Sequence, residues 1–301
     1  MSNNKVKANA NDILVSKKYS KRSRIGELWH HMKRNKGAVL GLCIIAAMLL
    51  IILYTVFFVD FSEVTAQNAL NTYAKPSAEH PFGTDDSGRD LLIRVLYGAR
   101  YSLVIGIGAV SLSLIAGLLF GATAGYYGGL VDDIIMRASD ILASIPATLL
   151  GMVIVVVLGA SLQNLLIAVG VTAIPAFIRI TRSSVLTVRN QEFVEAAKAI
   201  GMSNFRIIFT QVVPNGLSPV IVTVTTRIGA AIIESAGLSF LGFGVPAPAP
   251  EWGALIATGR AYIRSAPHLT LFPGLFIMIT VLAFNLFGDG LRDALDPKLK
   301  R

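Results

Sequence analysis

Five long stretches of this 301-residue chain carry no charged side chain, and they constrain its fold more than any other feature. A helix needs about 20 consecutive apolar residues to cross the hydrocarbon core of a bilayer. Each stretch reaches that length, so the chain is predicted to span a membrane several times. The stretches are Gly37–Val59 (23 residues), Tyr101–Val131 (31), Ile141–Ile178 (38), Ile207–Thr226 (20) and Ser265–Gly288 (24).

The composition agrees with a membrane protein and excludes several other classes. Hydrophobic residues make up 53% of the chain and charged residues 15%, whereas soluble domains carry roughly 25% charged residues. These values exclude a soluble enzyme, a disordered chain and a secreted disulfide scaffold. The single cysteine, Cys43, lies inside the first apolar stretch, so the chain has no intrachain disulfide and no cysteine-rich metal motif.

The lengths of the stretches predict six spans. The 38-residue stretch is interrupted at 159–164 by the turn-like sequence Gly-Ala-Ser-Leu-Gln-Asn, which divides it into two helices. The 31-residue stretch ends in the glycine-rich segment 125–129 and forms one span. The predicted spans cover 38–59 and about 100–125, 138–158, 162–183, 216–243 and 266–288.

The distribution of basic residues predicts the orientation. If the N-terminus is cytoplasmic, 20 of the 27 Lys and Arg residues lie inside, six lie outside and Arg227 lies in a span. Both termini are therefore expected in the cytoplasm. Because backbone groups in hydrocarbon must bond within their own segment, the chain is predicted to be an all-α polytopic membrane protein. The domains are a basic tail 1–37, the first span 38–59, an extracellular segment 60–98, a core 99–290 with a cytoplasmic loop 190–214, and a tail 291–301.

Sequence motifs of enzymes are missing from the chain. It contains no H-E-x-x-H and no G-x-S-x-G, and without any Gly-Lys dipeptide it lacks the phosphate-binding G-x-x-x-x-G-K-[ST] loop. Energy for transport would have to come from another polypeptide or from an ion gradient. Gly117, Gly121 and Gly125 recur every four residues and predict a face where another helix approaches closely.

The segment between the fourth and fifth predicted spans is the most informative. Residues 191–200 favour a helix with Phe193, Ala196, Ala197 and Ile200 on one face. Gly201 is suited to end that helix and Ser203 to cap the next one. Two short helices at an angle along the membrane surface are predicted, although a solvated connector or a lipid-surface helix has a similar pattern.

Four blocks of residues carry a resemblance to a known family. Glu195-Ala196-Ala197, with Gly201 six residues after the glutamate and Pro214 thirteen further on, resembles the "EAA" loop of the inner-membrane permease subunits of ABC importers. Gln211 and Val213 depart from the usual His and Leu. Three further blocks resemble the dipeptide/oligopeptide/nickel branch, and specifically the second permease of a pair: 80–90 with 97–103, 238–244 with 252–253, and 284–297.

The resemblance implies a type I ABC importer permease fold and a set of partners. These are a second homologous permease, two cytoplasmic ATPase subunits that bind ATP and Mg, and an extracytoplasmic substrate-binding protein, in the inner membrane of a prokaryote. No cofactor, metal or nucleic acid is expected on this chain. The residues implied to dock on the ATPase are Glu195, Ala196, Ala197, Ile200, Gly201 and Pro214. In a purely structural role, Glu195 would instead pair with Lys198 on its own helix.

Arg227 and Glu234 are the ionisable residues most clearly inside a span. Seven residues place them about 10 Å apart along one helix, and the cost of an unpaired charge in the bilayer requires a protein interior or a water-filled pathway around them. They are predicted either to line the pathway or to form a fixed pair with another subunit. Alternating prolines predict a stiff, extended segment at 245–252. This segment and residues 60–97 either contact the binding protein or simply close the outer vestibule.

The resemblance favours import of peptides driven by ATP. Nickel or another small solute is the alternative cargo within the family. The alternative from a different class is a self-contained secondary transporter, for which internal repeats would be expected and none is convincing.

Overall fold

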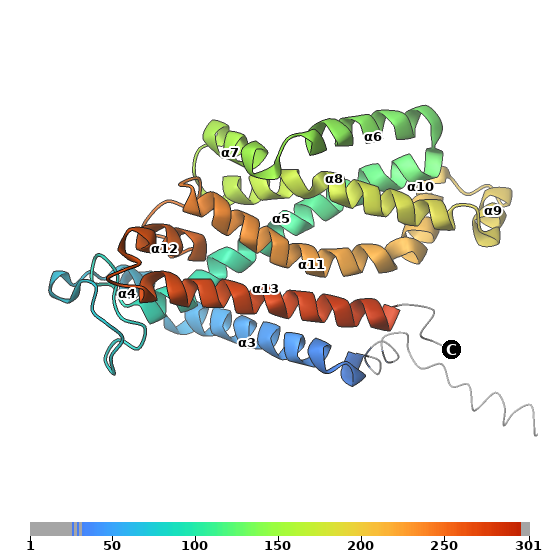
Figure 1. The fold of residues 1–301 in the computed structure, drawn as a ribbon. Coiled ribbons are helices and arrows are strands. Elements are labelled where there is room, and N and C mark those ends of the chain that lie inside the picture. Colours follow the sequence, from blue (N-terminus) through green and yellow to red (C-terminus); the bar gives the residue numbers. More distant parts are fainter. Residues whose placement is uncertain (1–25, 27–28, 30–31, 296–301) are drawn as a thin grey trace, which may run out of the picture.

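The computed structural model describes residues 26, 29 and 32–295, and helices dominate this part of the chain (Figure 1). Five of the described helices are long and apolar enough to cross a membrane, and a bent pair raises the number to six if it is one span. The five are α3 (Lys36–Phe58), α5 (Leu91–Tyr127), α8 (Leu162–Val188), the continuous helix Asn204–Phe240 that contains α10 (Asn204–Ile207) and α11 (Val213–Phe240), and α13 (His268–Leu295).

The third predicted span is wrong as a straight helix over 138–158. In its place α6 (Gly129–Ser144) and α7 (Ala147–Leu158) meet at an angle of 89°. Pro146 explains the bend, because the residue before a proline is disfavoured in the helical conformation. Ile145 is accordingly extended, with φ −88° and ψ 129°.

Two other boundaries differ from the predictions. α5 begins at Leu91, nine residues before the predicted start, because the side chain of Asp90 accepts a hydrogen bond from the Ile93 amide and caps the helix. α13 continues to Leu295, into the predicted tail 291–301. The remainder of that tail, and most of the predicted tail 1–37, lie outside the described residues.

The glycine face predicted on the second span is confirmed as a helix contact. A Cβ atom at Gly121 would stand 2.6 Å from the Ile178 carbonyl oxygen, and one at Gly125 would stand 2.9 Å from the Arg182 carbonyl oxygen. α5 and α8 therefore pack almost backbone to backbone. Around this pair lies the largest buried apolar cluster, to which Phe177 of α8 and Ile232 of α11 contribute fully buried side chains.

The bundle has two distinct ends (Figure 1). At one end lie the segment 60–90, which contains the short helix α4 (Phe61–Thr65), and the helix α12 (Trp252–Gly259); we call it the cap end. At the other end lie α9 (Glu192–Ala199) and α10; we call it the loop end. α3 and α13 run side by side along one side of the bundle, and α6 lies on the opposite side.

Candidate functional site

A tight helix-ending turn organises the segment at the loop end. Gly201 follows α9 with φ +77°, and its amide donates to the Lys198 carbonyl oxygen at 3.0 Å. The next amide, that of Met202, donates to the Ala197 carbonyl oxygen at 3.1 Å. This pattern satisfies carbonyl groups that a helix end leaves free, and it needs a left-handed residue. No atom lies within 4 Å of a Cβ built on Gly201, so conformation rather than space requires glycine there.

The apolar face of α9 differs from the predicted one. Val194 and Ala197 are buried against the protein's own chain, in a cluster with Val188 and Ile207. Ala197 is therefore not part of the free face. The outward residues are Phe193, Ala196, Ile200 and, from α10, Phe205, and the exposed fractions of the Ile200 and Phe205 side chains are 78% and 71%. Adjacent residues of a helix point to different sides. The predicted face included both Ala196 and Ala197, so it combined the outward side of α9 with its buried side.

α5 anchors the loop through Tyr126. Its hydroxyl donates to Oδ1 of Asn204 at 3.1 Å, and the Lys198 ammonium lies 5.3 Å from the centre of its ring. Lys198 thus faces Tyr126, and among the ion pairs of residues 32–295 none involves Glu195. The structure brings Glu195, Ala196 and Ile200 to one exposed loop end but does not pair Glu195 with Lys198.

The second helix of the predicted loop is the start of a long helix rather than a separate surface helix. α10 passes through a π-helical turn at Ile208–Val212 directly into α11, and Pro214 lies in the first turn of α11. Proline has no amide hydrogen, and its ring collides with the carbonyl group four residues earlier in a regular helix. The wider turn before Pro214 accommodates that ring without breaking the helix.

One side of α11 presents polar groups along the bundle. Pro219, Thr223, Arg227, Ala230 and Glu234 follow one another at spacings of three and four and share this side. Arg227 is exposed, and both it and Glu234 line one shallow hollow between α5, α8 and α11. The structure therefore brings the two predicted charges together. They form no ion pair with each other.

Glu234 has a partner that the sequence did not reveal. Its Oε1 accepts a hydrogen bond from the hydroxyl of Thr172 in α8 at 2.8 Å. This bond fixes the carboxyl group at the wall of the hollow, whereas Arg227 is exposed.

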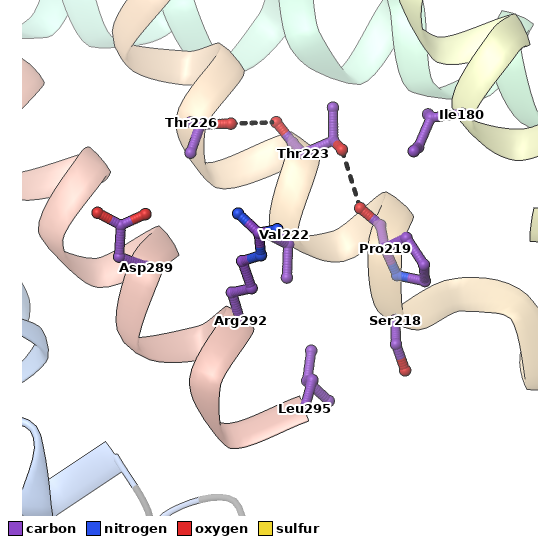
Figure 2. A pocket seen from close by; sticks show the side chains of 9 residues that line it. All are labelled: Ile180, Ser218, Pro219, Val222, Thr223, Thr226, Asp289, Arg292 and Leu295. Atoms are coloured by element: carbon purple, nitrogen blue, oxygen red, sulfur yellow. Dashed lines mark hydrogen bonds between the residues drawn. The ribbon is translucent and has the colours of Figure 1, made fainter. Parts of the chain in front are cut away.

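A larger hollow of about 490 Å³ opens between α8, α11 and α13 near the loop end (Figure 2). Arg292 reaches from α13 toward α11, and Asp289 stands one turn away on α13. The other residues that line this hollow are Ile180, Ser218, Pro219, Val222, Thr223, Thr226 and Leu295.

The cap end is built around a buried carboxyl group that sequence reasoning missed. Glu251 is fully buried, accepts hydrogen bonds from the Ala254 amide at 2.9 Å and the Ser102 hydroxyl at 3.3 Å, and caps α12. Burial raises the pKa of the Glu251 carboxyl above its ordinary value. The only available signal was an acidic residue directly before the helical sequence that starts at Trp252.

The proline-rich segment before Glu251 turns instead of extending as predicted. The Ala247–Pro248 peptide bond is cis, and the Ala249 amide donates to the Pro246 carbonyl oxygen at 3.3 Å. Trp252 then anchors the segment, because its indole Nε1 donates to the Val95 carbonyl oxygen at 2.8 Å. The described residues contain no group of three His, Cys, Asp or Glu side chains placed to hold a metal ion.

Comparison with known proteins decides the family. The profile of the family described as "Binding-protein-dependent transport system inner membrane component" matches residues 117–301, and that of the "N-terminal TM domain of oligopeptide transport permease C" matches residues 23–76. This chain belongs to the family of binding-protein-dependent transport system inner-membrane components. The chain is thus a permease component of a transport system and not an enzyme, as predicted.

Relatives of this permease align with nearly all of its length. It is 49% identical over 274 residues to the dipeptide transport system permease protein DppC of Alkalihalophilus pseudofirmus, which covers 91% of this chain and 90% of that protein. It is 42% identical to the di/tripeptide transport system permease protein DppC of Pseudomonas aeruginosa, covering 92% and 93%. It is 40% identical to the glutathione transport system permease protein GsiD of Escherichia coli O157:H7, covering 91% and 90%.

The fold of this permease is also found in a solved transporter. A chain of the MetNI methionine ABC transporter, in an inward-facing crystal form, superposes with a TM-score of 0.56 at 19% identity. The match covers 68% of this permease and 98% of that chain. The likeness confirms the predicted type I ABC importer permease fold.

Proposed function

We propose that this permease forms half of the pathway by which an ATP-driven importer moves short peptides across the inner membrane of a prokaryote. The names of the relatives, which include dipeptide, di/tripeptide and glutathione permeases, support peptides as the cargo. The structural observation that carries the proposal is the exposed apolar face of Phe193, Ala196 and Ile200, together with the exposed Phe205 of α10, on a loop that is braced by the transmembrane helix α5.

The loop end is assigned to the cytoplasm. The basic residues of the sequence favour this orientation, and an exposed apolar face is typical of a contact with a partner protein or a lipid surface. In this proposal the partner is one of two ATPase subunits that bind ATP and Mg. Glu195 orients the loop and Gly201 sets its bend. Pro214 lies at the start of α11, where movement of the ATPase and the loop is passed to this helix.

The cap end faces outward and receives the substrate-binding protein. Residues 60–97 and 245–252 both contribute to this end, and Trp252 and Glu251 fix the second of these segments. Two observations support a second, homologous permease beside this one. α7 buries only Gly151 and Val155, and the polar side of α11, with Arg227, is exposed. Charges at that depth need protein or water around them.

Purification and reconstitution test the proposal. We expect the ATPase subunits and the second permease to co-purify with the tagged chain, and we expect proteoliposomes of the complex to accumulate dipeptides when ATP and the binding protein are supplied. Ile200→Glu should remove the ATPase from the purified complex, because it places a charge on the apolar face. Gln191→Glu adds the same charge at an exposed residue outside that face and should retain the ATPase.

The competing readings give different results in the same assay. Uptake of nickel without uptake of peptides would assign a metal cargo. Transport by the chain alone, without ATPase subunits, would identify a secondary transporter. Unchanged peptide flux in both Arg227→Gln and Glu234→Gln would show that these charges do not line the pathway.

A further inference from the structure

The hollow between α8, α11 and α13 carries two charges of opposite sign on one helix (Figure 2). Asp289 and Arg292 are three residues apart on α13, and both are exposed. The described part of the chain contains no ion pair between them. Among residues 32–295 neither charge has an ion-pair partner, and both side chains face solvent, where a ligand could reach them.

Hydroxyl groups complete the polar lining on α11. The hydroxyls of Thr223 and Thr226 donate to backbone carbonyl oxygens of their own helix, those of Pro219 and Thr223. Their oxygens retain lone pairs that accept from an ammonium group. Ser218 is exposed at the rim. Val222 and Ile180 add apolar side chains to the lining.

We propose that this hollow is a binding site for the free amino and carboxylate ends of a short peptide, at the cytoplasmic exit of the pathway. The inference rests on the proposed function and names residues for it. Arg292 binds the peptide carboxylate, Asp289 binds the peptide ammonium, and the threonine hydroxyls accept from the ammonium or the peptide amide.

The dimensions fit this class of ligand. Side chains three residues apart on a helix have Cβ atoms about 5–6 Å apart, and two extended residues span about 7 Å. The volume of about 490 Å³ lies within the range of roughly 300–1,000 Å³ for small-ligand pockets. A simple anion such as phosphate fits less well, because the Asp289 carboxylate would repel it.

Position in the fold places the site at the exit. Ser218 lies one to two turns from the start of α11, and Leu295 ends α13, so the hollow is close to the loop end. The half-buried Thr223 and the exposed Arg227 continue the same side of α11 toward Glu234. A peptide that leaves the Arg227 and Glu234 region would meet Arg292 and Asp289 next.

Protection of an introduced thiol tests the site in the assembled complex. Ser218→Cys is made together with Cys43→Ala, so that the only thiol on this chain lies at the rim of the hollow. The rate of maleimide labelling is measured in proteoliposomes of phosphatidylcholine and phosphatidylglycerol, with dialanine on the loop side. We expect dialanine to slow labelling about tenfold, and N-acetyl-dialanine amide, which lacks both charges, to leave the rate unchanged.

Charge variants identify the residues responsible. Arg292→Gln and Asp289→Asn should each raise the dialanine concentration needed for half-maximal protection about tenfold. This factor corresponds to about 1.4 kcal/mol per lost contact. Arg137→Gln and Asp133→Asn, which remove exposed charges of α6 outside the hollow, should protect like the parent. Equal protection by N-acetyl-dialanine amide, or full protection by dialanine in Arg292→Gln, would overturn the proposal.

Two further results separate this inference from others. Protection that requires phosphatidylethanolamine and no peptide would assign the hollow to a lipid headgroup and overturn the peptide site. Dialanine uptake is measured in the same proteoliposomes. If uptake occurs without protection, the exit site is wrong while the proposed function stands. If no peptide is taken up, the proposed function itself fails.

Discussion

The turn at Gly201 offers a test of whether the bend of the loop transmits movement. An L-residue in the left-handed conformation costs about 1–2 kcal/mol, and a β-branched side chain lies at the upper end because it is rarely found there. Gly201 has φ +77° and open space around its Cα. Gly201→Val therefore changes the backbone preference without any steric collision elsewhere.

We expect the loop of Gly201→Val to be unwound, rather than bent, for part of the time. A cost of one to two kcal/mol changes the ratio of bent to unwound loop by a factor of about 5–30. The hydrogen bonds that the Gly201 and Met202 amides donate to carbonyl oxygens of α9 are the ones that would open. We expect the number of peptides imported per ATP hydrolysed to fall several-fold in Gly201→Val, while ATP hydrolysis continues.

Two comparison variants sharpen the test. Gly201→Asn should retain most of the coupling, because asparagine tolerates the left-handed conformation. Gly274→Val changes a helical glycine of α13 that also has open space around it and no positive φ, and it should transport normally. A normal ratio of import to ATP hydrolysis in Gly201→Val would refute the coupling role of the bend.

Three further changes test the packing and the cap end. Gly121→Leu should destabilise the purified permease by about 3 kcal/mol, because the new side chain would collide with the Ile178 backbone. The melting temperature in detergent should fall, and an unchanged value would contradict the α5–α8 packing. Trp252→Phe should cost about 0.5–1.5 kcal/mol, since it removes the hydrogen bond from the indole Nε1 to the Val95 carbonyl oxygen; hydrogen exchange at the cap end would report the loosening. Burial raises the pKa of Glu251 in the folded state. Its protonation therefore stabilises the fold fully below the ordinary pKa of about 4.3. This contribution is lost as the pH rises through the folded pKa. Glu251→Gln, which is neutral at every pH, should therefore show a flatter fall in melting temperature above pH 4.3 than the parent; identical profiles would exclude a titrating Glu251.

Local chemistry made several features predictable. Gly201 was expected to end a helix because few residues adopt positive φ, and the structure places the turn there. The glycine face around Gly121 was readable because a four-residue spacing brings residues to one side of a helix. Arg227 and Glu234 were expected on one face for the same reason, and they line one hollow.

Other features depend on which surfaces meet. The outward side of α9 could not be chosen from the sequence, because Ala196 and Ala197 suit either side and only packing against Val188 decides between them. Glu251 reads as an exposed acid in sequence, yet hydrogen bonds from Ser102, 149 residues away, allow it to be buried.

The sequence by itself determined that the chain crosses a membrane repeatedly as helices, because uncharged stretches of 20 to 38 residues must satisfy their backbone groups internally in lipid. It also determined the bend at Gly201. Only the tertiary structure decided how α6 and α7 turn by 89°, which side of α9 is free, and that Asp289 and Arg292 line one hollow between α8, α11 and α13. Periodicity describes one helix at a time, whereas a hollow between helices depends on side chains that are far apart in the chain.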